Sequence, residues 1–208
     1  MTEVMGIFME VTDIGENTGR PLRWDRAFMK RLFDILLSAL GLVILSPVFA
    51  AAALAVKAGD GGPVLFRQER VTKDGRVFRI LKLRSMRPAA YPGEPEEARV
   101  TRIGGFLRRH WLDELPQLVN VLLGDMSLVG PRPESLQDVA RSKELCPAFS
   151  RREQVRAGLT GLAQLLGRYD TPPREKLALD MLYIEHYSLG LDALLILQTV
   201  VLVFVKKE

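Results

Sequence analysis

The sequence predicts a mainly helical α+β fold that is attached to a membrane by a helix broken near its middle. Three observations support this expectation. Residues 35–56 carry no charge, two β-rich runs flank the Asp-Gly pair at 74–75, and much of the remaining chain has helical spacing of apolar residues. A hydrophobic content of 48% beside a charged content of 26% excludes a polytopic transporter and argues against disorder.

The charge balance narrows the possible partners. The chain of 208 residues has a net charge of +4 and a pI near 9.4, so its basic surface suits nucleic acid, anionic lipid or phosphorylated substrates. The apolar run favours lipid and phosphate. Aromatic interleaving and a recognisable nucleic-acid motif are missing, so a membrane-tethered nucleic-acid binder is the less favoured alternative. The single cysteine, Cys146, cannot form an internal disulfide and indicates a reducing compartment.

The uncharged run at residues 35–56 is the predicted membrane element. Its 22 residues would extend roughly 33 Å as one helix, which is enough to cross a hydrocarbon core. Pro47 lies inside the run, and proline removes a backbone donor and clashes with the preceding turn, so we expect a break. Each arm then measures only about 14–16 Å. The Ser46 hydroxyl can bond a carbonyl that Pro47 leaves free, which lowers the cost of a break in lipid.

Basic residues on both sides of this run predict a re-entrant helix–break–helix. They are Arg20, Arg23, Arg26, Lys30 and Arg31 before it, and Lys57, Arg67, Arg70, Lys73 and Arg76 after it. The positive-inside rule therefore places both ends in the cytoplasm. A kinked spanning helix, a buried helix pair and a cleaved signal peptide are the alternatives, the last disfavoured by the long polar stretch before the run. We divide the chain into an N-terminal extension (1–25), a re-entrant membrane helix (26–57) and a cytoplasmic domain with interfacial helices (58–208).

A small β-hairpin is expected next. The β-rich runs at 64–71 and 77–83 flank Lys-Asp-Gly-Arg at 73–76, and Asp-Gly between two such runs is a hairpin signal. Residues 88–98 contain three prolines and a glycine, which predicts a turn-rich loop.

The region 102–123 has helical periodicity. Apolar residues share one stripe at positions 112, 115, 118, 119 and 122. Because proline is accepted only in the first turn of a helix, Pro116 places the start of this helix near Leu112 or Asp113.

Three further segments are predicted to be helical. Residues 150–156 and 174–187 have helical patterns, and residues 189–205 are strongly apolar. The last segment contains Asp192 and Gln198 and is short for a membrane span, so we expect an interfacial or docking helix.

The candidate catalytic residues are the adjacent carboxylates Asp113 and Glu114. Neighbours on a helix diverge by about 100 degrees, so they cannot flank a bond as paired glycosidase carboxylates do. One can instead attack phosphorus or hold a metal while the other orients a proton or a second ligand. The ordinary alternative is that acidic residues are common in first helical turns because of the helix dipole.

Basic residues accompany this pair and suggest a phosphate-bearing substrate. Arg132 lies between Pro131 and Pro133, whose stiff backbone presents its guanidinium with little loss of entropy on binding. Planar bidentate donors of this kind suit phosphate oxygens. The candidate substrate-binding residues are Lys82, Arg84, Arg108, Arg132 and Arg168.

Six motifs in order carry a family resemblance. They are Lys-Leu-Arg-Ser-Met at 82–86, Thr-Arg-Ile-Gly at 101–104, Leu-Asp-Glu-Leu-Pro-Gln-Leu at 112–118, Asn-Val-Leu at 120–122, Gly-Asp-Met-Ser-Leu-Val-Gly-Pro-Arg-Pro at 124–133 and Gly-Leu-Thr-Gly-Leu-Ala-Gln at 158–164. From about residue 26 to the C-terminus the chain resembles the bacterial sugar transferase family, the monotopic phosphoglycosyl transferases. It looks like the minimal catalytic form, without the extra spanning helices of larger members.

The resemblance implies an activity. Such enzymes move a sugar phosphate from a UDP-sugar to a polyprenyl (undecaprenyl) phosphate at the cytoplasmic face of the bacterial inner membrane, with release of UMP, and they need Mg²⁺. This is the first membrane step of glycoconjugate assembly. The family mechanism makes Asp113 the nucleophile, through a covalent phosphosugar intermediate, and a magnesium contact, with Glu114 as its partner. Ser46-Pro47 matches the break of the family's re-entrant helix.

The resemblance also assigns the basic residues. Arg108, Arg132 and Arg168 match arginines that hold phosphates, and Lys82 matches a basic residue near the site. A non-catalytic scaffold of the same fold is the alternative function, against which the intact Asp113, Glu114 and Arg132 argue. The sequence indicates no oligomeric state. Departures from the family pattern are Ala157 for a common proline, Leu166 for a common asparagine, and His110-Trp111 for smaller or hydroxyl residues.

Overall fold

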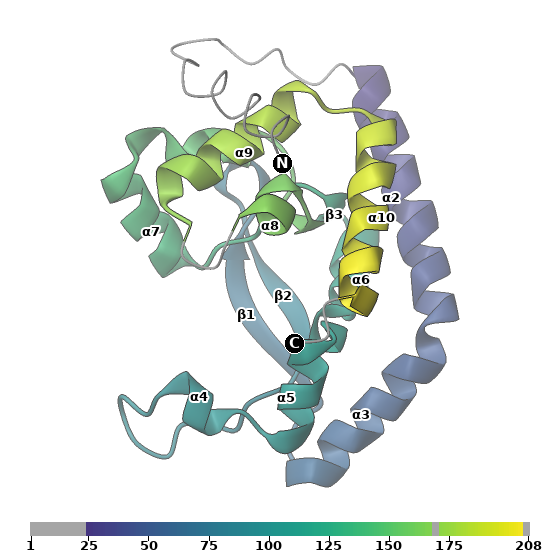
Figure 1. The fold of residues 1–208 in the computed structure, drawn as a ribbon, viewed down its shortest axis with the longest axis vertical. Helices are drawn as coiled ribbons and strands as arrows, with labels where there is room; N and C mark the ends of the chain where they lie inside the picture. The colour runs from purple at the N-terminus through teal and green to yellow at the C-terminus, as the bar shows by residue number, and fades with distance from the viewer. Residues whose placement is uncertain (1–23, 168–170, 206–208) are drawn as a thin grey trace.

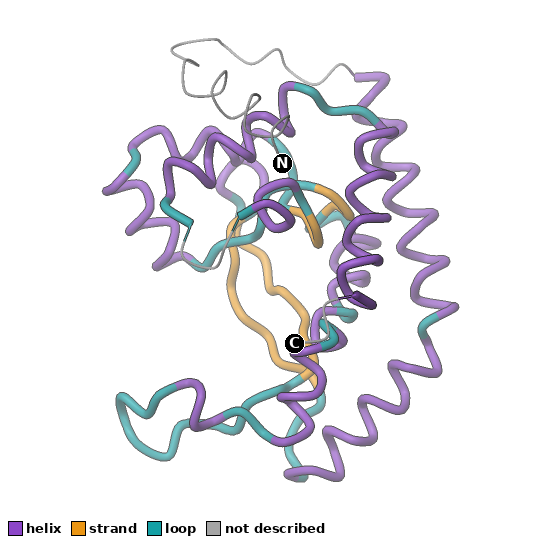
Figure 2. Tube along the Cα trace, in the orientation of Figure 1, coloured by secondary structure: helices purple, strands orange, loops and turns teal. Residues whose placement is uncertain are grey.

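The computed structural model describes residues 24–167 and 171–205. Helices dominate this part of the chain, and the strands form two small two-stranded sheets near its middle (Figure 2). The predicted mainly helical α+β class is therefore confirmed. Two long helices run along one side, and the hairpin and shorter helices pack against them (Figure 1).

The predicted break is present. Helices α2 (Trp24–Ile44) and α3 (Ser46–Asp60) are bent by 61° where they join. Pro47 has no N–H to bond the carbonyl of Val43, and the Ser46 hydroxyl donates to that carbonyl instead at 2.8 Å. Among the described helices none alone is long and apolar enough to cross a bilayer, whereas this bent pair meets both criteria when its arms are taken together.

One face of the bent pair packs on the protein and the other is exposed and apolar. Ala52 and Val56 of α3 join a small core with Leu83 and Leu107. The outer face carries exposed large apolar residues: Phe28, Leu32, Leu36, Leu40, Val43, Ile44, Val48 and Leu54. The pair is thus not a buried core element, which removes one of the alternatives weighed for this segment.

Polar residues fix the inner face of α2. The buried carboxylate of Asp34 accepts hydrogen bonds from Ser127 Oγ at 3.1 Å and from the Leu128 N–H at 3.0 Å. Lys30 forms an ion pair of 2.7 Å with Asp192 of α10 (Leu189–Val205), which lies beside α2. Burial on these partners orients α2 so that its apolar face points outward.

The expected hairpin is confirmed. Strands β1 (Leu65–Val71) and β2 (Val77–Leu83) pair antiparallel, with Phe66 opposite Lys82. The connecting turn needs positive φ at Asp74 (57°) and Gly75 (72°), the residue types that tolerate it. The following region, expected to be a turn-rich loop, contains the short helix α4 (Glu96–Arg99).

The region 102–123 is helical as expected, but the helix predicted to start near Leu112 or Asp113 starts at Gln117, after a 3₁₀ turn. Helix α5 (Arg102–Arg109) is followed by a separate 3₁₀ turn (Leu112–Glu114) and by α6 (Gln117–Leu123). Trp111 adopts a left-handed conformation with φ 55°, which interrupts the helix, and Pro116 caps α6. The carboxylate pair therefore lies in the turn that precedes α6.

The helices predicted for the C-terminal part of the chain are confirmed, with different bounds for the first two. Residues 150–156 were expected to be helical, and a 3₁₀ helix covers Pro147–Gln154. Helix α9 (Pro173–Glu185) replaces the expected 174–187, and α10 covers 189–205 as expected.

Besides α4, four elements were not predicted. They are α7 (Leu136–Leu145), α8 (Leu162–Leu166) and the parallel strands β3 (Ser127–Val129) and β4 (Gly158–Thr160). Strands of three residues are too short for alternation to be visible, and a parallel partner is distant in the sequence.

A buried ion pair joins the 3₁₀ helix to α9 and gives a stability prediction. Arg152 Nε lies 2.7 Å from Asp180 Oδ2, with side-chain exposures of 5% and 2%. Asp180→Ala removes the nearer carboxylate of the buried Arg152 and leaves only Glu134, at 3.6 Å, so we expect a loss of about 3 kcal/mol in the free energy of unfolding. Lys143→Ala, which breaks the partly exposed pair with Glu153, is the control and should cost about 1 kcal/mol or less. Urea denaturation in a fixed detergent measures both, and equal losses would contradict the prediction.

Candidate active site

The 3₁₀ turn at Leu112–Glu114, called the carboxylate turn below, faces strand β2 and the segment that carries Arg132. Lys82 Nζ lies 2.7 Å from Glu114 Oε1, and Arg132 Nη2 lies 3.3 Å from the same oxygen. The structure therefore brings together four of the predicted site residues, since Asp113 adjoins Glu114. Glu114 is clamped between two cations that come from distant parts of the chain.

Asp113 has a different environment from its neighbour. Its side chain is buried, and within the described residues it forms no ion pair. Burial, and then the negative charge of Glu114, raise the pKa of Asp113, although the charges of Lys82 and Arg108 act in the opposite direction. The Asp113 carboxylate is therefore more basic than an ordinary aspartate and is not held in an ion pair within the described residues.

The electrostatics of Glu114 have the opposite sign. Burial by itself raises the pKa of Glu114, but the charges and hydrogen bonds of Arg132 and Lys82 outweigh it, so the pKa of Glu114 is lowered. Two adjacent carboxylates with pKa values moved apart are a common arrangement where one acts chemically and the other remains ionised.

Arg108 reaches the site from α5. Its Nε donates to Ser85 Oγ at 3.2 Å, and Nη2 lies 3.1 Å from Met86 Sδ. The close approach of α5 to this strand end requires Gly104, because a Cβ there would lie 1.8 Å from the Ser85 carbonyl oxygen. Arg108 contributes its charge to Asp113 from this position.

Two predicted basic residues are not part of this cluster. The Arg84 guanidinium lies against Gly62 at the end of α3, where a Cβ on Gly62 would be 1.8 Å from Arg84 Nη1. Arg84 is not among the residues that line the pocket beside Glu114. Arg168 lies outside the described residues. The proposed roles of both remain predictions.

The pocket beside Glu114 includes two side chains that the sequence analysis missed. Its lining is Arg70, Ile80, Lys82, Glu114, Gln117, Arg132, Pro133, Gly158 and Leu159. Arg70 was counted only as a basic residue that flanks the membrane run, and Gln117 only as part of a motif. The available signal was that Gln117 follows the carboxylate pair by three residues and that Arg70 is one of several cations on the hairpin.

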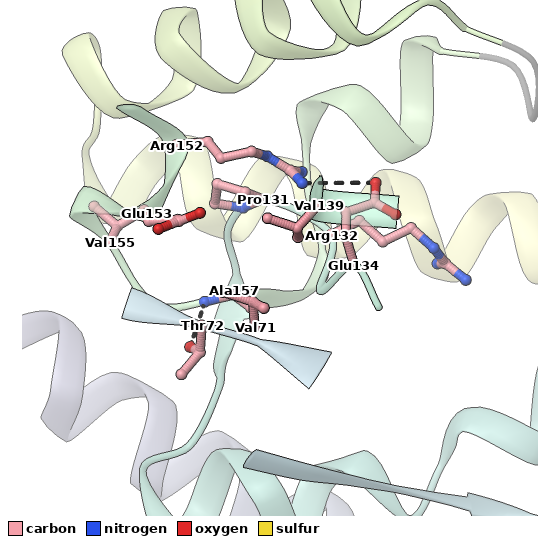
Figure 3. Close-up of a pocket in the computed structure, with 10 residues that line it drawn as sticks. All are labelled: Val71, Thr72, Pro131, Arg132, Glu134, Val139, Arg152, Glu153, Val155 and Ala157. Carbon is pink, nitrogen blue, oxygen red and sulfur yellow. Dashed lines mark hydrogen bonds and ion pairs between the residues drawn. The ribbon is translucent and has the colours of Figure 1, made fainter. Parts of the chain in front are cut away.

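Arg132 also lines a neighbouring pocket, in which other charges are already paired. There Arg152 Nη1 lies 3.6 Å from Glu134 Oε1, and Figure 3 shows the Arg132 side chain extending away from this pair. Glu134 also binds Lys176 at 2.9 Å. The guanidinium of Arg132 therefore interacts with Glu114 and lines the pocket beside it.

Backbone contacts hold the Gly-Pro-Arg-Pro segment in place. The Gly130 N–H donates to Thr160 O at 2.9 Å, and the Gly158 N–H donates to Pro131 O at 2.8 Å. Next to this ladder, the Ala157 N–H donates to Thr72 Oγ1 at 3.1 Å (Figure 3). The departure from proline at position 157 therefore supplies a donor that a proline would lack.

The described residues contain no group of three or more histidine, cysteine or acidic residues that could hold a metal ion. Mg²⁺ does not require such a group, because it is commonly bound by one or two carboxylates together with substrate phosphates and water. Asp113 suits this role, because Glu114 is already ion-paired.

Comparison with known proteins assigns the chain to a family. A profile of the bacterial sugar transferases matches residues 25–206, and the chain belongs to this family. The UDP-glucose:undecaprenyl-phosphate glucose-1-phosphate transferase of Escherichia coli (strain K12) is 40% identical over 197 residues, which cover 90% of this chain and 42% of that protein.

Two further relatives differ in length and in the sugar named. The UDP-N-acetylgalactosamine-undecaprenyl-phosphate N-acetylgalactosaminephosphotransferase of Aeromonas hydrophila is 41% identical, with 84% of this chain and 43% of the relative covered. The exopolysaccharide production protein PSS of Rhizobium leguminosarum bv. phaseoli is 41% identical, with 83% and 94% covered. The chain thus spans less than half of the first two relatives and nearly all of the third.

The raised pKa of Asp113 predicts the stability of Asp113→Asn. Ionised Asp113 destabilises the folded state. The stability of the wild type therefore falls as the pH rises from about 4, the ordinary pKa of an aspartate, through the raised pKa of Asp113. Asparagine does not ionise, so the variant does not lose this stability. We expect the Tm of Asp113→Asn at about pH 8 to equal or exceed that of the wild type, with the gap closing as the pH is lowered.

Glu114→Gln is the matched control with the opposite sign. Because the pKa of Glu114 is lowered, its ionised form stabilises the fold, and this contribution is lost as pH falls through the lowered value. The Tm of Glu114→Gln should therefore be lower than that of the wild type at neutral pH. Equal decreases in Tm for the two variants would show that the environments of the carboxylates do not differ.

Proposed function

We propose that this protein is a phosphoglycosyl transferase that moves a sugar phosphate from a UDP-sugar to a polyprenyl phosphate and releases UMP. The observation that carries the proposal is the buried, unpaired Asp113 beside a Glu114 that is clamped by Lys82 and Arg132. The names of relatives about 40% identical support the same reaction, with undecaprenyl phosphate as the acceptor.

The proposed chemistry is two displacements at one phosphorus atom. A carboxylate oxygen of Asp113 bonds to the phosphorus that bears the sugar, and the bond from that phosphorus to the UMP oxygen breaks. An oxygen of the polyprenyl phosphate then bonds to the same phosphorus, and the bond to Asp113 breaks, which restores the carboxylate. A carboxylate is a weak nucleophile, so positioning and charge neutralisation supply most of the rate.

The site residues divide this work. Asp113 is the better nucleophile of the pair because the pKa of Asp113 is raised and its carboxylate is unpaired, whereas Glu114 is neutralised. Glu114 holds Lys82 and Arg132 in place, and these cations, with Arg108, offset the charge of a diphosphate. When bound, Mg²⁺ would neutralise further phosphate charge, and Asp113 together with the substrate would hold it.

We place the reaction at the cytoplasmic face of the bacterial inner membrane, with the bent helix pair re-entrant. Its support is the 61° bend, the exposed apolar outer face, and basic residues on both flanks. On α10 the exposed residues Leu194, Leu197, Val200 and Val201 suit an interfacial position. The product would be the first lipid-linked sugar of a glycoconjugate, such as an exopolysaccharide.

The reaction is tested by UMP release. We expect release from one or two of a panel of UDP-sugars that includes UDP-glucose and UDP-N-acetylgalactosamine, in the presence of Mg²⁺ and a polyprenyl phosphate. Asp113→Asn should abolish it, because an amide cannot form the phosphorus bond. Release that persists in this variant would show that Asp113 is not the nucleophile. If no donor supports release by the folded wild type in lipid, the scaffold function replaces the enzymatic one.

The topology is tested by cysteine labelling in a Cys146→Ser background. Single cysteines at positions 20 and 73 lie on opposite sides of the bent pair in the sequence, and a re-entrant pair places both in the cytoplasm. A membrane-impermeant thiol reagent should label neither in intact spheroplasts and both after permeabilisation. Labelling of one position from outside would indicate a spanning helix instead.

A further inference from the structure

The side-chain amide of Gln117 has no evident role in the fold. Gln117 is 2% exposed, and its Nε2 is buried without a hydrogen-bond acceptor among the described residues. A buried donor without an acceptor loses its bonds to water and gains nothing in return, so it destabilises the protein unless a ligand completes it. Gln117 begins α6 and lines the pocket beside Glu114.

A second buried donor without an acceptor belongs to Arg70 of the hairpin. Arg70 Nη1 donates to Pro133 O at 3.3 Å and Nη2 donates to Gln68 Oε1 at 2.6 Å, but Nε is buried without an acceptor in the described part of the chain. Burial, and then the charge of Arg132, lower the pKa of Arg70, yet a guanidinium remains a cation at neutral pH. Two like charges are thus held close together.

The pocket that Arg70 and Gln117 both line has an excess of positive charge. Its charged members are Arg70, Lys82 and Arg132 against the single carboxylate of Glu114. Both contacts of Glu114, with Lys82 and with Arg132, fall on its Oε1, and Glu114 accepts no hydrogen bond from Arg70 Nε or Gln117 Nε2. An anion with several acceptor oxygens would pair with both and reduce the repulsion between the two arginines.

We propose that Gln117 and Arg70 form a phosphate-binding subsite, in which Gln117 Nε2 and Arg70 Nε donate hydrogen bonds to phosphate oxygens of the nucleotide donor. The subsite rests on the proposed function and extends it by two residues beside the Lys82–Glu114–Arg132 clamp. Gln117 supplies a donor without adding a fourth positive charge to a lining that already holds Arg70, Lys82 and Arg132.

The competing explanation is a trapped water molecule. A buried water can accept hydrogen bonds from groups that the protein leaves unpaired. In that case Gln117 would be structural, and its replacement by an apolar residue would change stability without changing nucleotide binding. The two explanations therefore differ in whether replacing Gln117 changes nucleotide binding or only the stability of the protein.

The test uses the full chain in detergent and the variant Gln117→Met, which keeps the length of the side chain and removes its donors. UDP binding is measured by calorimetry, and UMP release gives kcat/KM for two different UDP-sugars. We expect Gln117→Met to weaken UDP binding and to lower kcat/KM by about 10–100-fold, the effect of one hydrogen bond to a charged group, with the Tm unchanged or raised. Gln137→Met, an exposed glutamine of α7, is the matched control and should resemble the wild type.

Arg70→Lys separates charge from geometry. Lysine keeps the charge but has no Nε–H at the guanidinium position, so UDP binding should weaken by a smaller factor than in Arg70→Met. If a variant lowers kcat/KM equally for the two UDP-sugars, the lost contact was with phosphate. A loss of kcat/KM for only one UDP-sugar would overturn the phosphate subsite in favour of a sugar contact.

The outcomes keep the two proposals apart. If the wild type turns over no UDP-sugar but binds UDP in a manner that depends on Gln117 and Arg70, only the proposed reaction fails. If UDP binding and turnover of Gln117→Met equal those of the wild type, or the wild type does not bind UDP, the subsite is wrong. A lowered Tm with unchanged binding would assign Gln117 to a buried water.

Discussion

The buried side chain of Asn120 is the contact on which the geometry of the site depends. Its Oδ1 accepts from the Leu81 N–H and its Nδ2 donates to Arg79 O, both at 2.9 Å, so one amide occupies the free edge of β2 as a neighbouring strand would. Lys82 follows on this strand, and α6 is preceded by the carboxylate turn. The Asn120 bridge therefore sets the 2.7 Å approach of Lys82 to Glu114.

The same helix is tied to α2 at its other end. Arg31 of α2 donates to the carbonyls of Val121 and Leu122 at 2.6 and 2.8 Å, which satisfies acceptors that the end of α6 leaves open. Helix α6 is thus fixed between the hairpin and α2. The position of the carboxylates relative to the exposed apolar face of α2 and α3 follows from these two contacts.

Local signals in the sequence were sufficient to predict several structural elements and some of the residues that the structure brings together around Glu114. The Ser46-Pro47 break and the Asp-Gly hairpin depend on chemistry within a few residues, and both are confirmed. The association of Glu114 with Arg132 followed from the Pro-Arg-Pro segment and the family motifs. In contrast, the apolar periodicity of residues 102–123 did not reveal that Trp111 adopts a left-handed conformation between α5 and the turn that holds the carboxylates.

Features that depend on distant contacts could not be predicted. The parallel pairing of β3 and β4 joins segments that are far apart in the chain and only three residues long. Arg70 and Gln117 were missed because a pocket lining is decided by packing between β1, α6 and the Pro133 segment, and neither residue stands out in its own element. Arg84 was a candidate substrate-binding residue, and the sequence did not indicate that its guanidinium lies against Gly62 at the end of α3.

The bond from Ser46 to Val43 makes the bend self-contained. The ladder continues immediately around it, since the Leu45 N–H donates to Gly41 O and the Phe49 N–H to Leu45 O. The Val43 carbonyl, which Pro47 leaves without its helical donor, accepts a hydrogen bond from Ser46, three residues away. The angle between the two arms is therefore encoded in a short stretch of sequence, so the same few residues should produce the same bend if they were grafted into another helix.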